Sequence, residues 1–86
     1  MILGMDTEAV AALAGQLADV AERVRGIEQR LTSGLAATEW VGNDRQRFDA
    51  EWGSQHVVAL RQAAEALDDA SRVAADEVRQ QESASR

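Results

Sequence analysis

Apolar residues form a regular stripe along the first half of this chain. They recur at alternating spacings of three and four residues: Val10, Leu13, Leu17, Val20, Val24, Ile27 and Leu31. Such spacings keep side chains on one face of an α-helix. The pattern predicts a first helix over residues 7–38, with Asp6 as its N-cap. Gly34 occupies the next position of the stripe and leaves a gap there.

The apolar stripe of the second half changes its spacing along the chain. It begins with four residues spaced four apart: Phe48, Trp52, His56 and Leu60. It then alternates between three and four: Ala64, Leu67, Ser71, Ala74 and Val78. This change is a stutter, and it predicts a sideways shift of the stripe near His56. A second helix is predicted over residues 44–80, followed by a frayed polar tail over residues 81–86.

Both patterns stop at residues 39–43, Glu-Trp-Val-Gly-Asn. Gly42 can adopt the positive φ that a chain reversal after a helix often needs. Trp40 is expected to lay its ring over the open end of the helix pair, with its indole N–H near water or a carbonyl. Asn43 is predicted to cap the second helix, with Gln46 at the capping-box spacing. An all-α antiparallel two-helix hairpin follows, with its reversal near Val41.

Folding the chain back at this turn pairs residues from the two predicted helices. It places Gly34 opposite Phe48 and Leu31 near Trp52, so the second helix would supply a ring where the first lacks a side chain. Trp-x-Gly is a short pattern, and an ordinary turn with one apolar plug is an equally good interpretation of it. Charged residues one turn apart, such as Arg61–Glu65 and Asp68–Arg72, are predicted to form solvated surface pairs.

Length and composition point to association. The chain has 86 residues, 45% of them apolar and only 3% aromatic, so it forms one small domain without a large core. A lone hairpin buries one stripe per helix, which leaves little stability over chain entropy, and a four-helix dimer is predicted. A second stripe of small residues is the predicted dimer interface: Ala59, Ala63, Ala66, Ala70 and Val73. The alternative is that these alanines only favour helix on an exposed face.

Several functions are disfavoured by the residues present. The formal net charge of −6 argues against binding nucleic acid or an anionic membrane surface. No segment is long enough to span a bilayer, and Met1–Met5 lacks the basic start of a cleaved signal peptide. Without cysteine, and with His56 as the one histidine, no metal site, cofactor site or catalytic relay is expected. The chain is predicted not to be an enzyme, and His56 is predicted to be a half-buried interface residue.

Trp40-Val41-Gly42 between two amphipathic helices, with Phe48 and Trp52 following, resembles the WXG (Trp-X-Gly) family of small type VII (ESX) secretion proteins. The resemblance covers nearly the whole chain, including its length, acidity, central turn and lack of proline and cysteine. It implies hairpins that pair antiparallel into four-helix dimers. It also implies synthesis in the cytoplasm and export by a membrane ATPase without a cleaved signal peptide. Trp40 and Gly42 would belong to the export-related end.

One departure from the family concerns the tail. Family members that carry the export signal have a tyrosine there, followed four residues later by an acidic residue. This chain has no tyrosine, and Val78 with Glu82 is the nearest match in spacing. The resemblance therefore implies the signal-less member of a pair. A heterodimer with a second WXG-type hairpin is favoured, a homodimer is possible, and the ATPase would bind through the partner's tail. The alternative function is a cytosolic coiled-coil adaptor or chaperone for a secreted partner.

Overall fold

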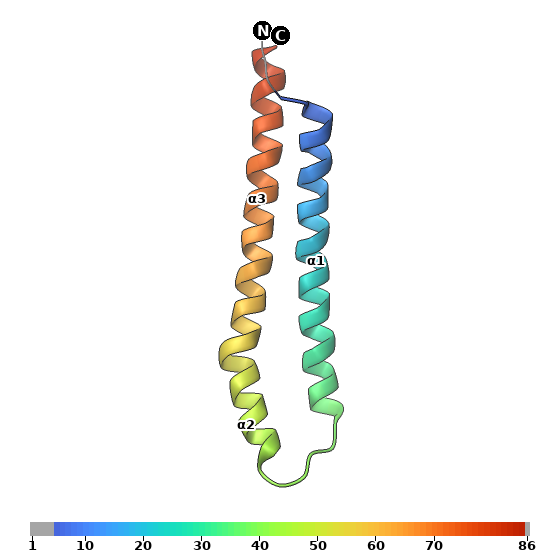
Figure 1. The fold of residues 1–86 in the computed structure, drawn as a ribbon, viewed down its shortest axis with the longest axis vertical. Coiled ribbons are helices and arrows are strands. Elements are labelled where there is room, and N and C mark those ends of the chain that lie inside the picture. The colour runs from blue at the N-terminus through green and yellow to red at the C-terminus, as the bar shows by residue number, and fades with distance from the viewer. Residues whose placement is uncertain (1–4, 86) are drawn as a thin grey trace.

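The described part of the chain, residues 5–85 of a computed structural model, is an antiparallel hairpin of two long helical rods (Figure 1). The molecule measures 67 × 17 × 14 Å, and the start of α1 and the end of the second rod lie at the end away from the turn. The first rod is one helix and the second has three segments: α1 (Thr7–Ala37), then α2 (Asp44–Glu51), η1 (Trp52–His56) and α3 (Val57–Ala84). The predicted all-α hairpin is confirmed.

The start of α1 and the turn follow local backbone chemistry. Asp6 caps α1, because its Oδ1 accepts a hydrogen bond from the Ala9 N–H at 3.1 Å. Gly42 has a φ of +73°, a conformation that costs other residues more because of their Cβ atom. Trp40 covers the end of α1, and its indole N–H donates to the Leu35 carbonyl at 3.3 Å. The same carbonyl, in the last turn of α1, also accepts from the Thr38 N–H at 3.4 Å.

Asn43 does not cap the second rod in the way the sequence predicted. It precedes α2 with a ψ of 3°, and its side chain makes no capping hydrogen bond. Capping side chains reach back over the first turn from an extended backbone, which this ψ does not provide. A different contact closes the turn: Nη2 of Arg45 donates to the Ala36 carbonyl at 3.2 Å. The predicted capping box with Gln46 is therefore wrong, and an arginine ties the two rods together.

The second rod contains a π-helical turn, η1, where the sequence pattern changes its spacing. A π-turn holds more residues than an α-turn and so moves the following side chains round the rod. This is the structural form of the sideways shift expected near His56. The last helix then continues to Ala84. The tail predicted to fray from residue 81 is thus largely helical, in keeping with the good helix formers Gln80, Gln81 and Glu82.

The contact between the rods is built on small side chains. Ala14, Ala21 and Ala64 are the buried apolar residues of the described chain, and no large side chain is fully buried. The α3 residues that face α1 are the predicted stripe, extended by one residue at its start: Val57, Leu60, Ala64, Leu67, Ser71, Ala74 and Val78. Alanines at these positions let the two helix axes approach closely, so the seam is narrow.

On α1 the predicted stripe is only partly used by the hairpin. The buried line runs through Ala14, Ala21 and Glu28, one residue after stripe members Leu13, Val20 and Ile27. Four large stripe residues remain 38–48% exposed: Leu13, Val20, Ile27 and Leu31. The single seam predicted for α1 is thus corrected: the contact with α3 is made by Ala14 and Ala21, whose small side chains let the helix axes approach closely, and the bulky residues lie beside it. The predicted partner of Gly34 is also absent, since a Cβ built there would meet no atom within 4 Å.

Candidate docking surface

One side of the hairpin carries two ion pairs that join α1 to α3. Nη2 of Arg25 lies 2.6 Å from Oδ2 of Asp68, and Nε of Arg61 lies 2.8 Å from Oε1 of Glu28. These four residues are called the polar flank below. The sequence paired Arg61 with Glu65 and Asp68 with Arg72 along one helix, and that prediction is wrong. Both residues find partners across the hairpin, because the rods lie close enough for their side chains to meet.

Glu28 is the centre of a hydrogen-bonded chain on the polar flank. It is only 5% exposed, at a seam position that an apolar residue would usually occupy. Its Oε2 accepts from the Thr32 hydroxyl at 3.0 Å, and that hydroxyl accepts from the Trp52 indole N–H at 2.8 Å. The hydrogen bond from Arg61 lowers the pKa of Glu28, against the opposing effect of desolvation. The chain of bonds therefore holds a charged carboxylate in the seam and fixes α1 against η1.

This arrangement predicts an acid-sensitive hairpin. Because the folded-state pKa of Glu28 lies below its ordinary value of 4.5, its contribution to stability is complete above that pH. The contribution is lost as the pH falls through the lowered pKa. Glu28→Gln keeps the shape of the side chain but cannot titrate, so thermal melts between pH 7 and pH 3 should show a smaller pH dependence for the variant. Equal pH dependence of the two proteins would contradict this role.

The opposite side of the hairpin is apolar. Arg25 stands four residues after the buried Ala21 of α1, and Asp68 stands four residues after the buried Ala64 of α3. Because Arg25 and Asp68 contact each other, they lie on the same side of the hairpin. A residue directly before a seam residue lies about 100° round the helix from it, toward the side of the hairpin opposite Arg25 and Asp68. On α1 these are Leu13, Val20 and Ile27, with Leu31 beside them. On α3 they are the predicted interface residues Ala59, Ala63, Ala66, Ala70 and Val73, all exposed. These nine residues are called the apolar face.

The apolar face indicates a binding partner. It places bulky side chains along one helix beside a row of small ones along the other, and the hairpin leaves both open to solvent. Contiguous exposed apolar surface of this kind usually marks an interaction site. The alanine row also permits close approach of another helix. The exposed apolar residues therefore suggest an oligomeric partner, on the side opposite the polar flank.

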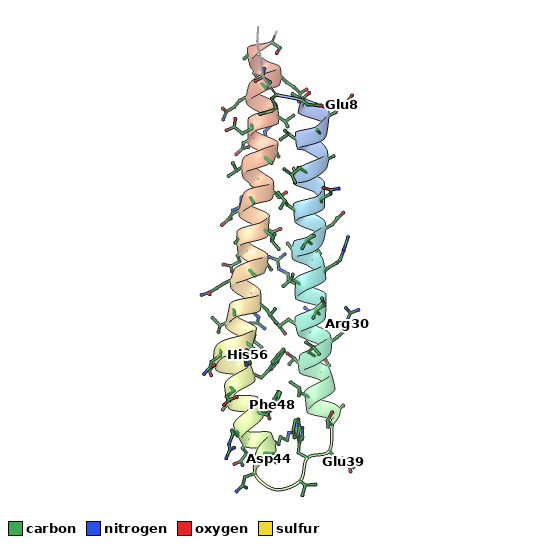
Figure 2. The ribbon with its side chains drawn as sticks, in the orientation of Figure 1. Glu8, Arg30, Glu39, Asp44, Phe48 and His56 are labelled. Atoms are coloured by element: carbon green, nitrogen blue, oxygen red, sulfur yellow. The ribbon has the colours of Figure 1, made fainter. Side chains whose placement is uncertain are left out.

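The aromatic residues near the turn form two separate groups. Trp40 and Phe48 pack together with ring centroids 5.3 Å apart, while Val41 at the tip is 89% exposed. Figure 2 shows Phe48 near the turn, between Asp44 and His56 along the second rod. Trp52 instead lies by Thr32, with its ring 5.9 Å from His56. His56 is exposed in the hairpin, and its predicted place in an interface stays a prediction. The π-turn rotates it away from the seam.

A groove lies where α1 meets the start of the second rod. Its volume is about 370 Å³, and its floor includes Leu35, Trp52 and Val57. Two acidic and two basic side chains line it: Glu28, Asp49, Arg45 and Arg61. Sequence reasoning missed this groove because it depends on the π-turn and on contacts across the hairpin. Within residues 5–85 there is no cluster of three or more potential metal ligands, and no helix there is apolar and long enough to cross a membrane.

Comparisons with models of protein families, with curated proteins and with solved structures find no match. The hairpin of two long helices is consistent with the WXG family but is not specific to it, since other helical hairpins share this architecture.

Proposed function

We propose that this chain is a non-enzymatic type VII (ESX) secretion protein, exported as the signal-less member of a helical-hairpin dimer. The observation that carries the proposal is the Trp40-Val41-Gly42 turn at the tip of the hairpin. The turn combines a half-buried tryptophan, a positive-φ glycine and an exposed valine. In the WXG family, which the sequence resembles, this turn belongs to the export-related end.

A dimer is supported by the apolar face. The hairpin buries no large side chain fully, so covering Leu13, Val20, Ile27 and Leu31 would add the apolar burial that the chain lacks by itself. A second WXG-type hairpin has the length and amphipathic pattern to cover this face. Val78 stands four residues before Glu82, where a tail signal would have its tyrosine, so the partner is the proposed carrier of the signal. The secretion ATPase would then bind through the partner's tail.

A cytosolic adaptor is the second candidate function, and the same apolar face supports it. In that role the hairpin would hold a helix of a secreted client protein and stay behind in the cytoplasm. Location distinguishes the two functions. Under the export proposal the chain is found in culture filtrate and disappears from it when the secretion ATPase is inactivated. Under the adaptor proposal it stays inside the cells in both cases.

Trp40→Phe tests the role of the turn. Phenylalanine keeps most of the apolar contact with Phe48 but removes the indole N–H that bonds the Leu35 carbonyl. Helicity should be retained and the melting temperature should fall by only a few degrees, since a similar-sized apolar swap costs under about 1.5 kcal/mol. Secretion of this chain and its partner, measured by immunoblotting of culture filtrates, should nevertheless drop.

Trp52→Phe is the matched control for Trp40→Phe. It removes an indole N–H that bonds the Thr32 hydroxyl, away from the turn, and should leave secretion intact. Normal export of the Trp40→Phe variant in an intact complex would contradict a recognition role for the turn. A secretion defect in both variants, in proportion to the stability that each has lost, would also contradict it.

A further inference from the structure

The part of the second rod nearest the turn is held to α1 by few contacts. α1 packs on α3, whereas the second rod diverges from α1 toward the turn, where α2 lies (Figure 1). No residue of α2 is buried, and within residues 5–85 one hydrogen bond joins α2 to α1, from Arg45 to the Ala36 carbonyl. The ring contact of Phe48 with Trp40 of the loop is a second attachment. Residues 38–51, called the turn end below, therefore have little packing of their own.

The sequence of α2 explains this weak attachment. Its eight residues, Asp-Arg-Gln-Arg-Phe-Asp-Ala-Glu, contain one large apolar side chain, Phe48, which is itself exposed. Most of the stability of a helix in a protein comes from packing of an apolar face, and isolated helices shorter than about 12–15 residues are marginal in water. α2 has no apolar face and is shorter than this limit. Its helical structure therefore depends on Phe48 and on continuity with the rest of the rod.

Just beyond α2 the rod is fixed to α1 again. The Trp52 indole N–H donates to the Thr32 hydroxyl at 2.8 Å. That hydroxyl donates to Glu28, which Arg61 of α3 also holds. These hydrogen bonds are called the anchor below. Because Trp52 is the first residue of η1, the anchor lies where α2 meets the π-turn, a kind of turn often found at functional sites. This junction separates a weakly held segment from a firmly held one.

We infer that the turn end opens as one unit, with η1 as its boundary, while α1 and α3 stay packed. Opening separates Phe48 from Trp40 and breaks the hydrogen bond from Arg45 to Ala36. α2 then unwinds as far as Trp52, where the anchor holds the rod to α1. Local openings of this kind cost less free energy than global unfolding where few buried contacts are lost. No residue of the apolar face belongs to the turn end, so opening leaves that face unchanged.

Opening changes the surface that the turn offers to a partner. The groove beside η1 is lined by Ala36 on α1 and by Arg45 and Asp49 on α2, so it exists only while the turn end is closed. The packed pair of Trp40 and Phe48 likewise exists only in the closed state. The turn end is thus a two-state device that a partner can order or release without disturbing the contact between α1 and α3. The inference concerns the chain by itself and does not rest on the proposed export.

Amide hydrogen exchange of the purified chain, followed by NMR in increasing concentrations of urea, tests the inference. The amides of residues 48–51 in α2 should exchange at least about 10-fold faster than those of residues 63–66 in α3, after correction for intrinsic rates. Their rates should also be nearly independent of urea, because local opening exposes little surface. Equal rates with equal dependence on urea would mean that the turn end opens only with the whole hairpin, which would overturn the inference.

Phe48→Ala removes the ring that holds α2 to the loop. This variant should speed the exchange of residues 49–51 several-fold and leave residues 63–66 unchanged. Val58→Ala is the control, because Val58 is about as exposed as Phe48 but lies in α3. Equal acceleration of residues 49–51 by both substitutions would overturn the inference that the aromatic contact keeps the turn end closed.

Thr32→Val tests the boundary at η1. Valine keeps the shape of threonine but gives the Trp52 indole N–H no acceptor. The opening should then extend through η1, so the Val57 amide, which donates to the Trp52 carbonyl, should exchange faster than in the unmodified chain. Thr38→Val is the control, because the Thr38 hydroxyl bonds only the Gly34 carbonyl of its own helix, and it should leave Val57 unchanged. Unchanged exchange of Val57 in the Thr32→Val variant would overturn η1 as the boundary.

Discussion

Ala21→Leu should strongly destabilise the hairpin. Ala21 is fully buried, at 0% exposure, where α1 touches α3, and the seam has room only for small side chains. A leucine there would push the helix axes apart, and overpacking of this kind typically costs about 1–3 kcal/mol. For a chain of this size such a loss lowers the melting temperature by roughly 5–20 °C. Thermal unfolding followed by circular dichroism measures it.

The matched control is Ala12→Leu, which makes the same change on the exposed side of α1 away from both the seam and the apolar face. Both variants carry a residue with good helix propensity, so a difference between them reports packing. An Ala21→Leu variant as stable as the control would show that the rods are not held at the close distance that the buried alanines require.

Ile27→Asp should abolish docking on the apolar face while leaving the hairpin folded. Ile27 is 42% exposed in the hairpin, so a partner docked on the apolar face would cover surface that α3 leaves open. Burial of an isoleucine is worth about 1.5–3 kcal/mol, and desolvation of the new carboxylate adds a further penalty. In a homodimer the change occurs twice. The dissociation constant should therefore rise by at least about 100-fold, measured by analytical ultracentrifugation over a dilution series.

Val58→Asp is the control for this change. Val58 is 45% exposed, similar to Ile27, but lies on α3 away from the apolar face. It places the same charge on the same molecule and should leave the dissociation constant almost unchanged. Equal weakening by both substitutions would indicate a general effect of charge or helix stability. Weakening by Val58→Asp alone would move the docking surface to the other side of α3.

The sequence pattern was sufficient for the elements that depend on neighbouring residues. Asp6 caps α1 by accepting a hydrogen bond from the backbone N–H of Ala9, three residues later in the sequence. The positive φ of Gly42 follows from its missing side chain. The α3 stripe was also predictable, because it holds the leucines Leu60 and Leu67, whereas the stripe beside it consists of four alanines and Val73. On α1 two adjacent lines competed. Periodicity selected the row of large residues that includes Val20, whereas the hairpin buries the adjacent row that includes Ala21.

The contacts of the polar flank depend on the distance between the rods and could not be predicted from spacing along one helix. Glu28 stands one residue after the apolar stripe, and nothing in the periodicity marks it as buried. Its partners Arg61 and Trp52 come from the other rod. The lengthwise alignment of α1 with α3 decides which side chains meet, and only the three-dimensional fold sets that alignment.

The π-turn at Trp52–His56 has a consequence for how chain length can vary. An α-helix covering the same span would need one residue fewer, so η1 amounts to a single inserted residue absorbed inside a rod. Its deletion would restore an unbroken α-helix without much rotation of the turn side relative to α3, because the π-turn takes up the extra residue locally. Phe48 would then stay beside Trp40. Loss of one residue from the regular part of α3 would instead rotate the flanking segments by about 100°. Homologous chains are therefore expected to tolerate the loss of one residue within η1 but to conserve the residue count along α3.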